Sequence, residues 1–378
     1  MQVAMAAARA AESDASVGAC RPCGIEVERK PYLQLCDVDV SIGIEAAGLL
    51  HGGLLELELN HCRVPGIGDL TSAPALQRLE LRDNALKTIE GLAAVPELTH
   101  LDLQGNQIEK VGAALATCAK LIHLDLSYNK LSLKKAASLS ANVMPSLTEL
   151  YLPGNLLKTT RLLAEVASSV VTLDIGSNRL KHIGPELARL QGLTKLFMGA
   201  NRIGAVDHLS GLSCLRVLSL QANALRSVRG LGGLSSLTEL YLSENKLSDL
   251  EGLPTSCPGL QILDIASNHL TSLRGVGAFP SLEDVWANSN RMTDLCGALD
   301  ELVTLPKLTT AYLQFNTWVK PRQGEATNCI GCVITGFRPG GWQLHYPAQS
   351  APEMTPEEYK RAVIIRLPRL QQLDDTYR

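Results

Sequence analysis

A short motif recurs along the chain at a nearly fixed interval, and it constrains the fold more than any other feature. The motif reads apolar-x-apolar-x-x-Asn, as in LDLQGN, LYLPGN and LDIASN. Its asparagines follow one another at intervals of 22 to 26 residues, and an earlier segment, LELNHC, has Cys62 in the same position. Repeats of this length indicate structural units that bury their apolar faces only against neighbouring units. The asparagines are Asn84, Asn106, Asn129, Asn155, Asn178, Asn201, Asn223, Asn245, Asn268, Asn290 and Asn316.

The motif and its period are typical of the leucine-rich repeat. Each repeat begins with a short strand whose two apolar residues point into the core, while the residue between them points outward. We therefore predict an α/β solenoid of about twelve repeats of the 22-residue type, with a parallel sheet on its concave face and a C-terminal helical cap. The asparagine amides should satisfy backbone groups that the bend after each strand leaves unpaired.

The repeats divide the chain into five segments. Residues 1–30 are rich in Ala, Ser and Gly and predict a flexible tail, with a transit peptide as the weaker alternative. Residues 31–55 should cap the first repeat, and residues 56–320 should form the solenoid. Residues 321–354 lack any apolar period and predict a disordered or loosely packed insertion, or else a partner-facing flap. Residues 355–378 should form the C-terminal cap, with Thr355 as N-cap and Pro356 as the first helical residue.

Composition narrows the class of protein. The 378 residues carry a formal net charge of -3, which argues against a dedicated nucleic-acid binder. The sequence has no apolar run long enough for a membrane span and no signal-peptide pattern. Ten cysteines, mostly scattered singly, fit a reducing compartment. We therefore expect an intracellular protein that contacts neither membrane nor nucleic acid.

The residues that point outward from the strands determine the chemistry of the concave face. Six of these twelve residues are acidic, five are aromatic and none is basic, although only 4% of the chain is aromatic. Aromatic residues exposed on a sheet indicate an interface, and carboxylates beside them select a basic partner. A merely solvated strand face is the alternative, but it should also contain Thr, Lys and Arg. The twelve are Glu58, Glu80, Asp102, Asp125, Tyr151, Asp174, Phe197, Ser219, Tyr241, Asp264, Trp286 and Tyr312.

Signals for chemistry are weak elsewhere. The pairs Cys20-x-x-Cys23 and Cys329-x-x-Cys332 lie near opposite ends of the predicted solenoid, so a shared zinc site is not expected. The sequence contains none of the motifs HExxH, GxSxG, GxGxxG or GxxxxGK. His100 and His123 occupy equivalent repeat positions, which predicts a solvated pair that arose by duplication. We predict no enzyme activity, no cofactor and no metal.

A family resemblance extends from Glu56 to Asp374. The segments LDIGSNRL, LFMGANRI, LYLSENKL and LDIASNHL, the opening ELELNHCRV and the closing EYKRAVIIRLPRLQQLDD resemble, in order, the leucine-rich-repeat regulatory subunit of protein phosphatase 1, the sds-twenty-two type. The resemblance implies a non-catalytic protein that binds the phosphatase catalytic subunit on its concave face. It also implies a monomer when alone, a location in nucleus and cytoplasm, and a further phosphatase regulator as a second candidate partner.

The resemblance also implies which residues bind the partner. They are Asp125, Tyr151, Asp174, Phe197, Asp264, Asp284, Trp286 and Tyr312, and the outward strand positions add Tyr241. Asp174 and Asp284 stand where the family tends to have glutamate, and Tyr151 stands where it has phenylalanine. Trp286 should be the largest exposed apolar group on this face. An adaptor for another protein, such as a cytoskeletal or ciliary scaffold, is the main alternative, and an RNA-particle component would need basic residues here.

Overall fold

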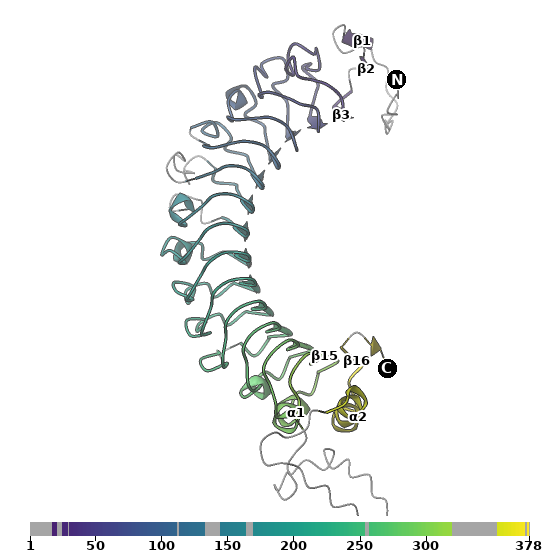
Figure 1. The fold of residues 1–378 in the computed structure, drawn as a ribbon. Coiled ribbons are helices and arrows are strands. Elements are labelled where there is room, and N and C mark those ends of the chain that lie inside the picture. The colour runs from purple at the N-terminus through teal and green to yellow at the C-terminus, as the bar shows by residue number, and fades with distance from the viewer. Residues whose placement is uncertain are drawn as a thin grey trace, which may run out of the picture. The chain divides into compact units, whose positions relative to one another are not determined.

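The computed structural model describes residues 17–20, 25–28, 30–111, 113–132, 144–163, 169–253, 257–319, 354–374 and 376–377. The chain divides into two compact units, Met1–Arg202 and Ile203–Arg378. In each unit the strands line the inner side of a curve, and the segments that connect them lie on the outer side (Figure 1). Each unit therefore has the arrangement that the repeat predicts.

Unit 1 contains a parallel sheet in which strands that are consecutive in the sequence pair with each other. The described parts of the connecting segments contain the 3-10 turns η1 (Leu92–Ala94), η2 (Arg161–Leu163) and η3 (Leu187–Arg189). The strands are β3 (Tyr32–Cys36), β4 (Glu56–Asn60), β5 (Arg78–Glu80), β6 (His100–Asp102), β7 (His123–Asp125), β8 (Glu149–Tyr151), β9 (Thr172–Asp174) and β10 (Lys195–Phe197).

The N-terminal end of unit 1 has more structure than the sequence predicts. Strand β3 lies within the predicted cap region and pairs in parallel with β4, so it extends the sheet by one strand. Strands β1 (Val17–Cys20) and β2 (Ile25–Glu28) pair antiparallel within the segment predicted as a flexible tail. The remainder of residues 1–29 lies outside the described residues, so the prediction of a tail there stays a prediction.

Unit 2 continues the same strand pattern and ends in the helical cap. Its parallel strands are β11 (Val217–Ser219), β12 (Glu239–Tyr241), β13 (Ile262–Asp264), β14 (Asp284–Trp286), β15 (Thr310–Tyr312) and β16 (Gln372–Leu373). Strand β17 (Thr376–Tyr377) pairs antiparallel with β16. The connecting segments contain η4 (Val276–Ala278), α1 (Leu295–Val303) and, before β16, α2 (Pro356–Arg366).

Helix α2 begins where the sequence predicts. The Thr355 hydroxyl accepts a hydrogen bond from the Glu358 amide, and the Glu358 carboxylate accepts one from the Thr355 amide, which forms a capping box. After α2 the chain returns to the sheet as β16 and closes its end, a strand that the sequence pattern does not reveal. The predicted insertion lies outside the described residues between 320 and 353.

The asparagines of the repeated motif, here called the asparagine ladder, are confirmed to have a structural role. Asn129 illustrates it: its Oδ1 accepts the Ile108 amide at 2.9 Å, and its Nδ2 donates to the carbonyls of Leu103 and Leu126 at 2.9 and 3.1 Å. The residue before the asparagine, Tyr128, has a φ of 51°, so the chain bends there as the strand ends. The ladder therefore joins each repeat to the one before it.

The two ends of the ladder use other side chains. Cys62 is fully buried, and its thiol lies 3.5 Å from the Leu35 carbonyl and 3.2 Å from the Asn60 carbonyl. At the other end the Oδ1 of Asp374 accepts the amides of Leu313 and Gln314 at 2.8 and 2.9 Å. Backbone groups at both ends of the ladder are thus satisfied as well.

Replacing Asn268 by alanine is expected to lower the free energy of unfolding by about 1–3 kcal/mol or more, because several buried backbone groups lose their partner. Asn268 is 4% exposed, its Oδ1 accepts the Leu247 amide, and its Nδ2 donates to the carbonyls of Leu242, Ile265 and Ala266. Urea-induced unfolding followed by circular dichroism measures the loss. Asn288→Ala is the matched control, since within the described part of the chain the side-chain Nδ2 of Asn288 donates only to the Ser289 hydroxyl, at 3.4 Å. Equal losses in both variants would contradict the structural role of the ladder.

Candidate protein-binding face

The predicted binding residues align in two rows, one on the sheet of each unit. In unit 1 Asp125 pairs in register with Tyr151, Tyr151 with Asp174, and Asp174 with Phe197. In unit 2 the row is Tyr241, Asp264, Trp286 and Tyr312, again on neighbouring strands. Asp284 begins β14 two residues before Trp286, so both side chains leave the same face of the strand. The structure thus brings together the residues that the sequence selects within each unit.

The row of unit 1 combines two carboxylates and two rings, all half-buried. Asp125 and Asp174 each accept a backbone hydrogen bond at 2.8 Å, from the amides of Ser127 and Gly176. Burial raises the pKa of Asp174 and of the Tyr151 hydroxyl. The Tyr151 ring lies 5.3 Å from the His123 ring on the neighbouring strand. These side chains are held in place but remain partly open to solvent.

The row of unit 2 contains an aromatic cluster, formed by Tyr241, Trp286 and Tyr312. The Trp286 ring meets Tyr241 at a centroid distance of 6.3 Å and Tyr312 at 5.9 Å, both edge-on. The Tyr241 hydroxyl donates to Glu239 Oε2 at 2.9 Å, and burial together with this bond raises the pKa of Tyr241 to about 12. The Tyr312 hydroxyl accepts from Gln372 Nε2 at 2.6 Å. Hydrogen bonds therefore fix the two outer rings of the cluster.

Trp286 is less exposed than the sequence predicts. It is half-buried, and its indole Nε1 is buried with no hydrogen-bond partner among the described residues. Tyr241 and Tyr312 cover part of its surface, so Trp286 is only partly exposed on the concave face. Phe315, which lies beyond the end of β15, is 75% exposed instead.

Asp264 is buried within the row of unit 2. It is 5% exposed, and its Oδ1 accepts the Ala266 amide at 3.0 Å. Tyr241 and Trp286 flank it on the two neighbouring strands, and their rings approach to 6.3 Å, although two strand spacings amount to roughly 9.5 Å. The rings therefore lean together over the shorter aspartate, and burial raises its pKa. Little of this carboxylate is available for a partner to touch.

Replacing Asp264 by asparagine is expected to stabilise the protein at neutral pH. A carboxyl whose pKa is raised on folding favours the protonated native state, so its contribution to stability falls as pH rises above the ordinary value of 3.8. Asparagine keeps the shape and can still accept the Ala266 amide, but it carries no charge. The melting temperature of Asp264→Asn should exceed that of the wild type at pH 7, and the gap should narrow as pH falls toward 3.8. A gap that does not change with pH would contradict this account.

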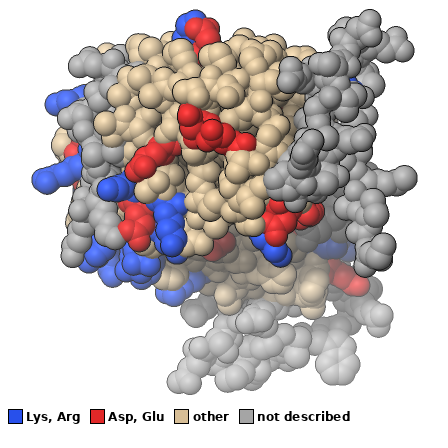
Figure 2. Space-filling view, turned by 90° about the horizontal axis from the view of Figure 1, so that it is seen from above, with Lys and Arg blue, Asp and Glu red and all other residues tan. Residues whose placement is uncertain are grey.

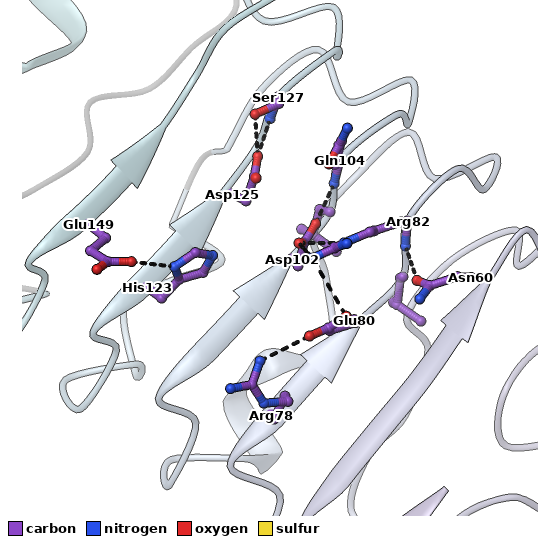
Figure 3. A network of polar contacts seen from close by, with 12 residues as sticks. Asn60, Arg78, Glu80, Arg82, Asp102, Gln104, His123, Asp125, Ser127 and Glu149 are labelled. Atoms are coloured by element: carbon purple, nitrogen blue, oxygen red, sulfur yellow. Dashed lines mark hydrogen bonds and ion pairs between the residues drawn. The ribbon is translucent and has the colours of Figure 1, made fainter. Parts of the chain in front are cut away.

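Basic side chains also lie on this face, which the sequence analysis missed. Arg82 places Nε and Nη2 both 2.6 Å from Asp102 Oδ2, and Arg78 Nη1 lies 2.9 Å from Glu80 Oε1 (Figure 3). Asp102 and Glu80, 3% and 9% exposed, are thus neutralised within the chain. Arg78 begins β5 two residues before Glu80 and on the same face, and Arg82 follows two residues after the strand ends. Reading every alternate residue of the motif, rather than one residue per strand, would have found them.

Charges of both signs lie interspersed on the surface seen in Figure 2, where most of the visible described surface is uncharged. Among the described residues, no helix is long and apolar enough to cross a membrane. The thiols of Cys62, Cys118 and Cys257 are buried, as expected of small apolar core residues. Three of the four cysteines in the two Cys-x-x-Cys motifs lie outside the described residues, namely Cys23, Cys329 and Cys332.

Comparison with known families decides the class of the chain. The family model "Leucine rich repeat" matches residues 53–108, 96–157 and 168–225, and the model "Leucine Rich repeats (2 copies)" matches residues 215–255. Together these matches cover about half of the sequence. The chain belongs to the leucine-rich-repeat family. Members of this family act as protein–protein interaction scaffolds, and the fold is typical of proteins that are not enzymes.

Solved structures of the same fold resemble this leucine-rich-repeat protein. An internalin, inlF, from Listeria monocytogenes is 22% identical over 78% of this chain and 84% of that chain, with a TM-score of 0.65. The Leptospira interrogans protein LIC12759 is 21% identical over 90% and 89%, with a TM-score of 0.55. A chain in the octameric complex of Latrophilin 3, Unc5D and FLRT2 is 22% identical over 69% and 84%, with a TM-score of 0.62. These identities show the fold alone, and no curated protein matches the sequence.

Proposed function

We propose that this leucine-rich-repeat protein is a non-catalytic regulatory subunit that binds the catalytic subunit of protein phosphatase 1 through its strand face. The ordered resemblance of its repeats and cap to that class of subunit suggests the partner. The observation that carries the proposal is the aromatic cluster of Tyr241, Trp286 and Tyr312, which lies beside the half-buried carboxylates of Glu239 and Asp284. Large rings in such a setting supply most of the binding energy of many interfaces.

The geometry of the cluster suits a preformed binding surface. The hydroxyl of Tyr241 is hydrogen-bonded to Glu239, and that of Tyr312 is hydrogen-bonded to Gln372. Both rings are therefore ordered before a partner binds. Ordering side chains at an interface costs roughly 0.5–1.5 kcal/mol each, and a preformed cluster avoids much of that cost. Hydroxyls and carboxylates at its edge can then accept hydrogen bonds from lysine or arginine side chains of the partner.

The row of unit 1 supplies a second contact surface of the same chemistry. Its carboxylates, Asp125 and Asp174, alternate with the rings of Tyr151 and Phe197 on neighbouring strands. Asp125 and Asp174 form no ion pair with a basic side chain among the described residues, unlike Glu80 and Asp102. They are therefore carboxylates of unit 1 that a basic partner surface can neutralise.

Titration calorimetry with the full-length chain and the purified phosphatase catalytic subunit tests the proposal. We expect saturable binding in a one-to-one complex that weakens as salt concentration rises, because rim charges contribute. A folded chain that does not bind would refute the phosphatase proposal. Capture of a different protein from cell lysate would then support the alternative of an adaptor.

A further inference from the structure

We propose that unit 1 carries a binding site for a divalent transition metal ion of the Zn²⁺ type, formed by Asp102, His123 and Asp125. One ligand atom from each residue lies within 4.8 Å of the others. Asp102 and Asp125 face each other in register on strands β6 and β7, and His123 precedes Asp125 by two residues on the same face. The inference does not depend on the proposed function.

A carboxylate outside the cluster orients the histidine. His123 Nδ1 lies 2.8 Å from Glu149 Oε2 on β8. Figure 3 shows the two side chains pointing toward each other. A neutral imidazole that donates from Nδ1 to a carboxylate keeps its lone pair on Nε2, which is how metal-binding histidines are commonly held. The His123 ring also packs between His100, at a centroid distance of 5.8 Å, and Tyr151, at 5.3 Å. Bonding and packing together restrict the rotation of the ring.

Hydrogen bonds from backbone amides hold the carboxylates of Asp102 and Asp125 in place. Asp102 Oδ1 accepts the Gln104 amide at 3.0 Å, and Asp125 Oδ1 accepts the Ser127 amide at 2.8 Å. Asp102 is 3% exposed, and this burial raises the pKa of its carboxyl. The negative charge of the nearby Asp125 also raises that pKa. One imidazole nitrogen and two carboxylate oxygens form a donor set that suits Zn²⁺ with a water as fourth ligand. Ca²⁺ and Mg²⁺ prefer oxygen ligands alone.

The local charge balance favours a cation. Four carboxylates, from Glu80, Asp102, Asp125 and Glu149, lie in the network of Figure 3 with two guanidinium groups, from Arg78 and Arg82. Two negative charges remain in excess when His123 is neutral, and one divalent ion would balance them. Arg82 is the competitor, because it already occupies Asp102 Oδ2. An ion would share Asp102 with Arg82, so the guanidinium should weaken binding by repulsion.

Calorimetric titration of the full-length protein with Zn²⁺ tests the site by comparing variants. Cysteine thiols of the chain can also bind Zn²⁺, so the readout is the difference in stoichiometry between variants. We expect His123→Phe, which keeps a ring in the stack, to lose one equivalent of Zn²⁺ relative to the wild type. The matched control His100→Phe should keep that equivalent. Arg82→Gln should bind it about tenfold more tightly, because a neighbouring positive charge is removed.

The result that would overturn the proposal is equal stoichiometry in folded wild type and folded His123→Phe. If His123→Phe does not fold, the variant Glu149→Gln carries the test instead, because Glu149 is partly exposed and contacts the metal only through His123. Loss of such an orienting partner should weaken Zn²⁺ binding by about 10- to 100-fold, and unchanged affinity would refute the site. With Co²⁺ as the probe, the site should give visible absorption bands that disappear in His123→Phe, without a thiolate charge-transfer band of its own. Bands that persist in that variant would count against it.

Discussion

Replacing Trp286 by alanine is expected to weaken binding of the phosphatase 1 catalytic subunit by at least about thirtyfold, which corresponds to about 2 kcal/mol. Trp286 is the central ring of the aromatic cluster and contacts both tyrosines. Its removal takes away the largest ring of the surface and also the edge-on contacts that pack Tyr241 and Tyr312 against it, although both tyrosines keep their hydrogen bonds. Both effects act in the same direction, since the partner loses contact area and must order the remaining side chains itself.

Two further variants make this measurement specific. Asp284→Ala should cause a smaller loss that shrinks at high salt, because Asp284 is a half-buried charge beside the cluster. Phe315→Ala removes an aromatic side chain that is 75% exposed and lies outside the cluster, and it should leave affinity unchanged. Circular dichroism serves as the folding control for all three. Wild-type affinity in folded Trp286→Ala would remove the aromatic cluster as the binding site.

Replacing Phe279 by alanine is expected to lower the free energy of unfolding by about 3–5 kcal/mol. Phe279 is 1% exposed and is among the largest side chains that are fully buried. It is the C-cap residue of η4, and its ring is enclosed in the core of unit 2. Alanine leaves a cavity there, and rigid neighbouring repeats can close it only in part.

Phe315→Ala is the matched control for stability as well. It removes the same side chain in the same unit, but from a largely exposed position, so the change should stay within about 0.5 kcal/mol. Urea-induced unfolding of both variants and the wild type measures the difference. Similar midpoints for Phe279→Ala and Phe315→Ala would show that the core of unit 2 is not packed as described.

Much of the fold could be predicted from local patterns in the sequence. Alternation of apolar residues places strands β4 to β15, and the asparagine after each strand predicts the bend and its hydrogen bonds. Thr355, Pro356 and Glu358 together predict the start of α2, because a capping box is a local feature. Strands β3 and β16 could not be predicted in the same way. YLQLC has the apolar alternation of the motif, with Leu33 and Leu35 in register with Leu57 and Leu59, but it lacks the asparagine that marks the other strands. QL is too short to show any alternation, and its pairing with β15 identifies it as a strand.

The sequence by itself determined which residues point outward from the sheet, since the strand period of two and the repeat period together decide this. Only the tertiary structure decided which of those residues remain available. Asp264 is covered by rings of its two neighbours, Asp102 is neutralised by Arg82, and Trp286 is half-covered by two tyrosines. The physical reason is that residues about 22 positions apart lie only about 4.8 Å apart across the sheet. Charge pairing and ring packing therefore depend on side-chain reach between strands, which no single repeat contains.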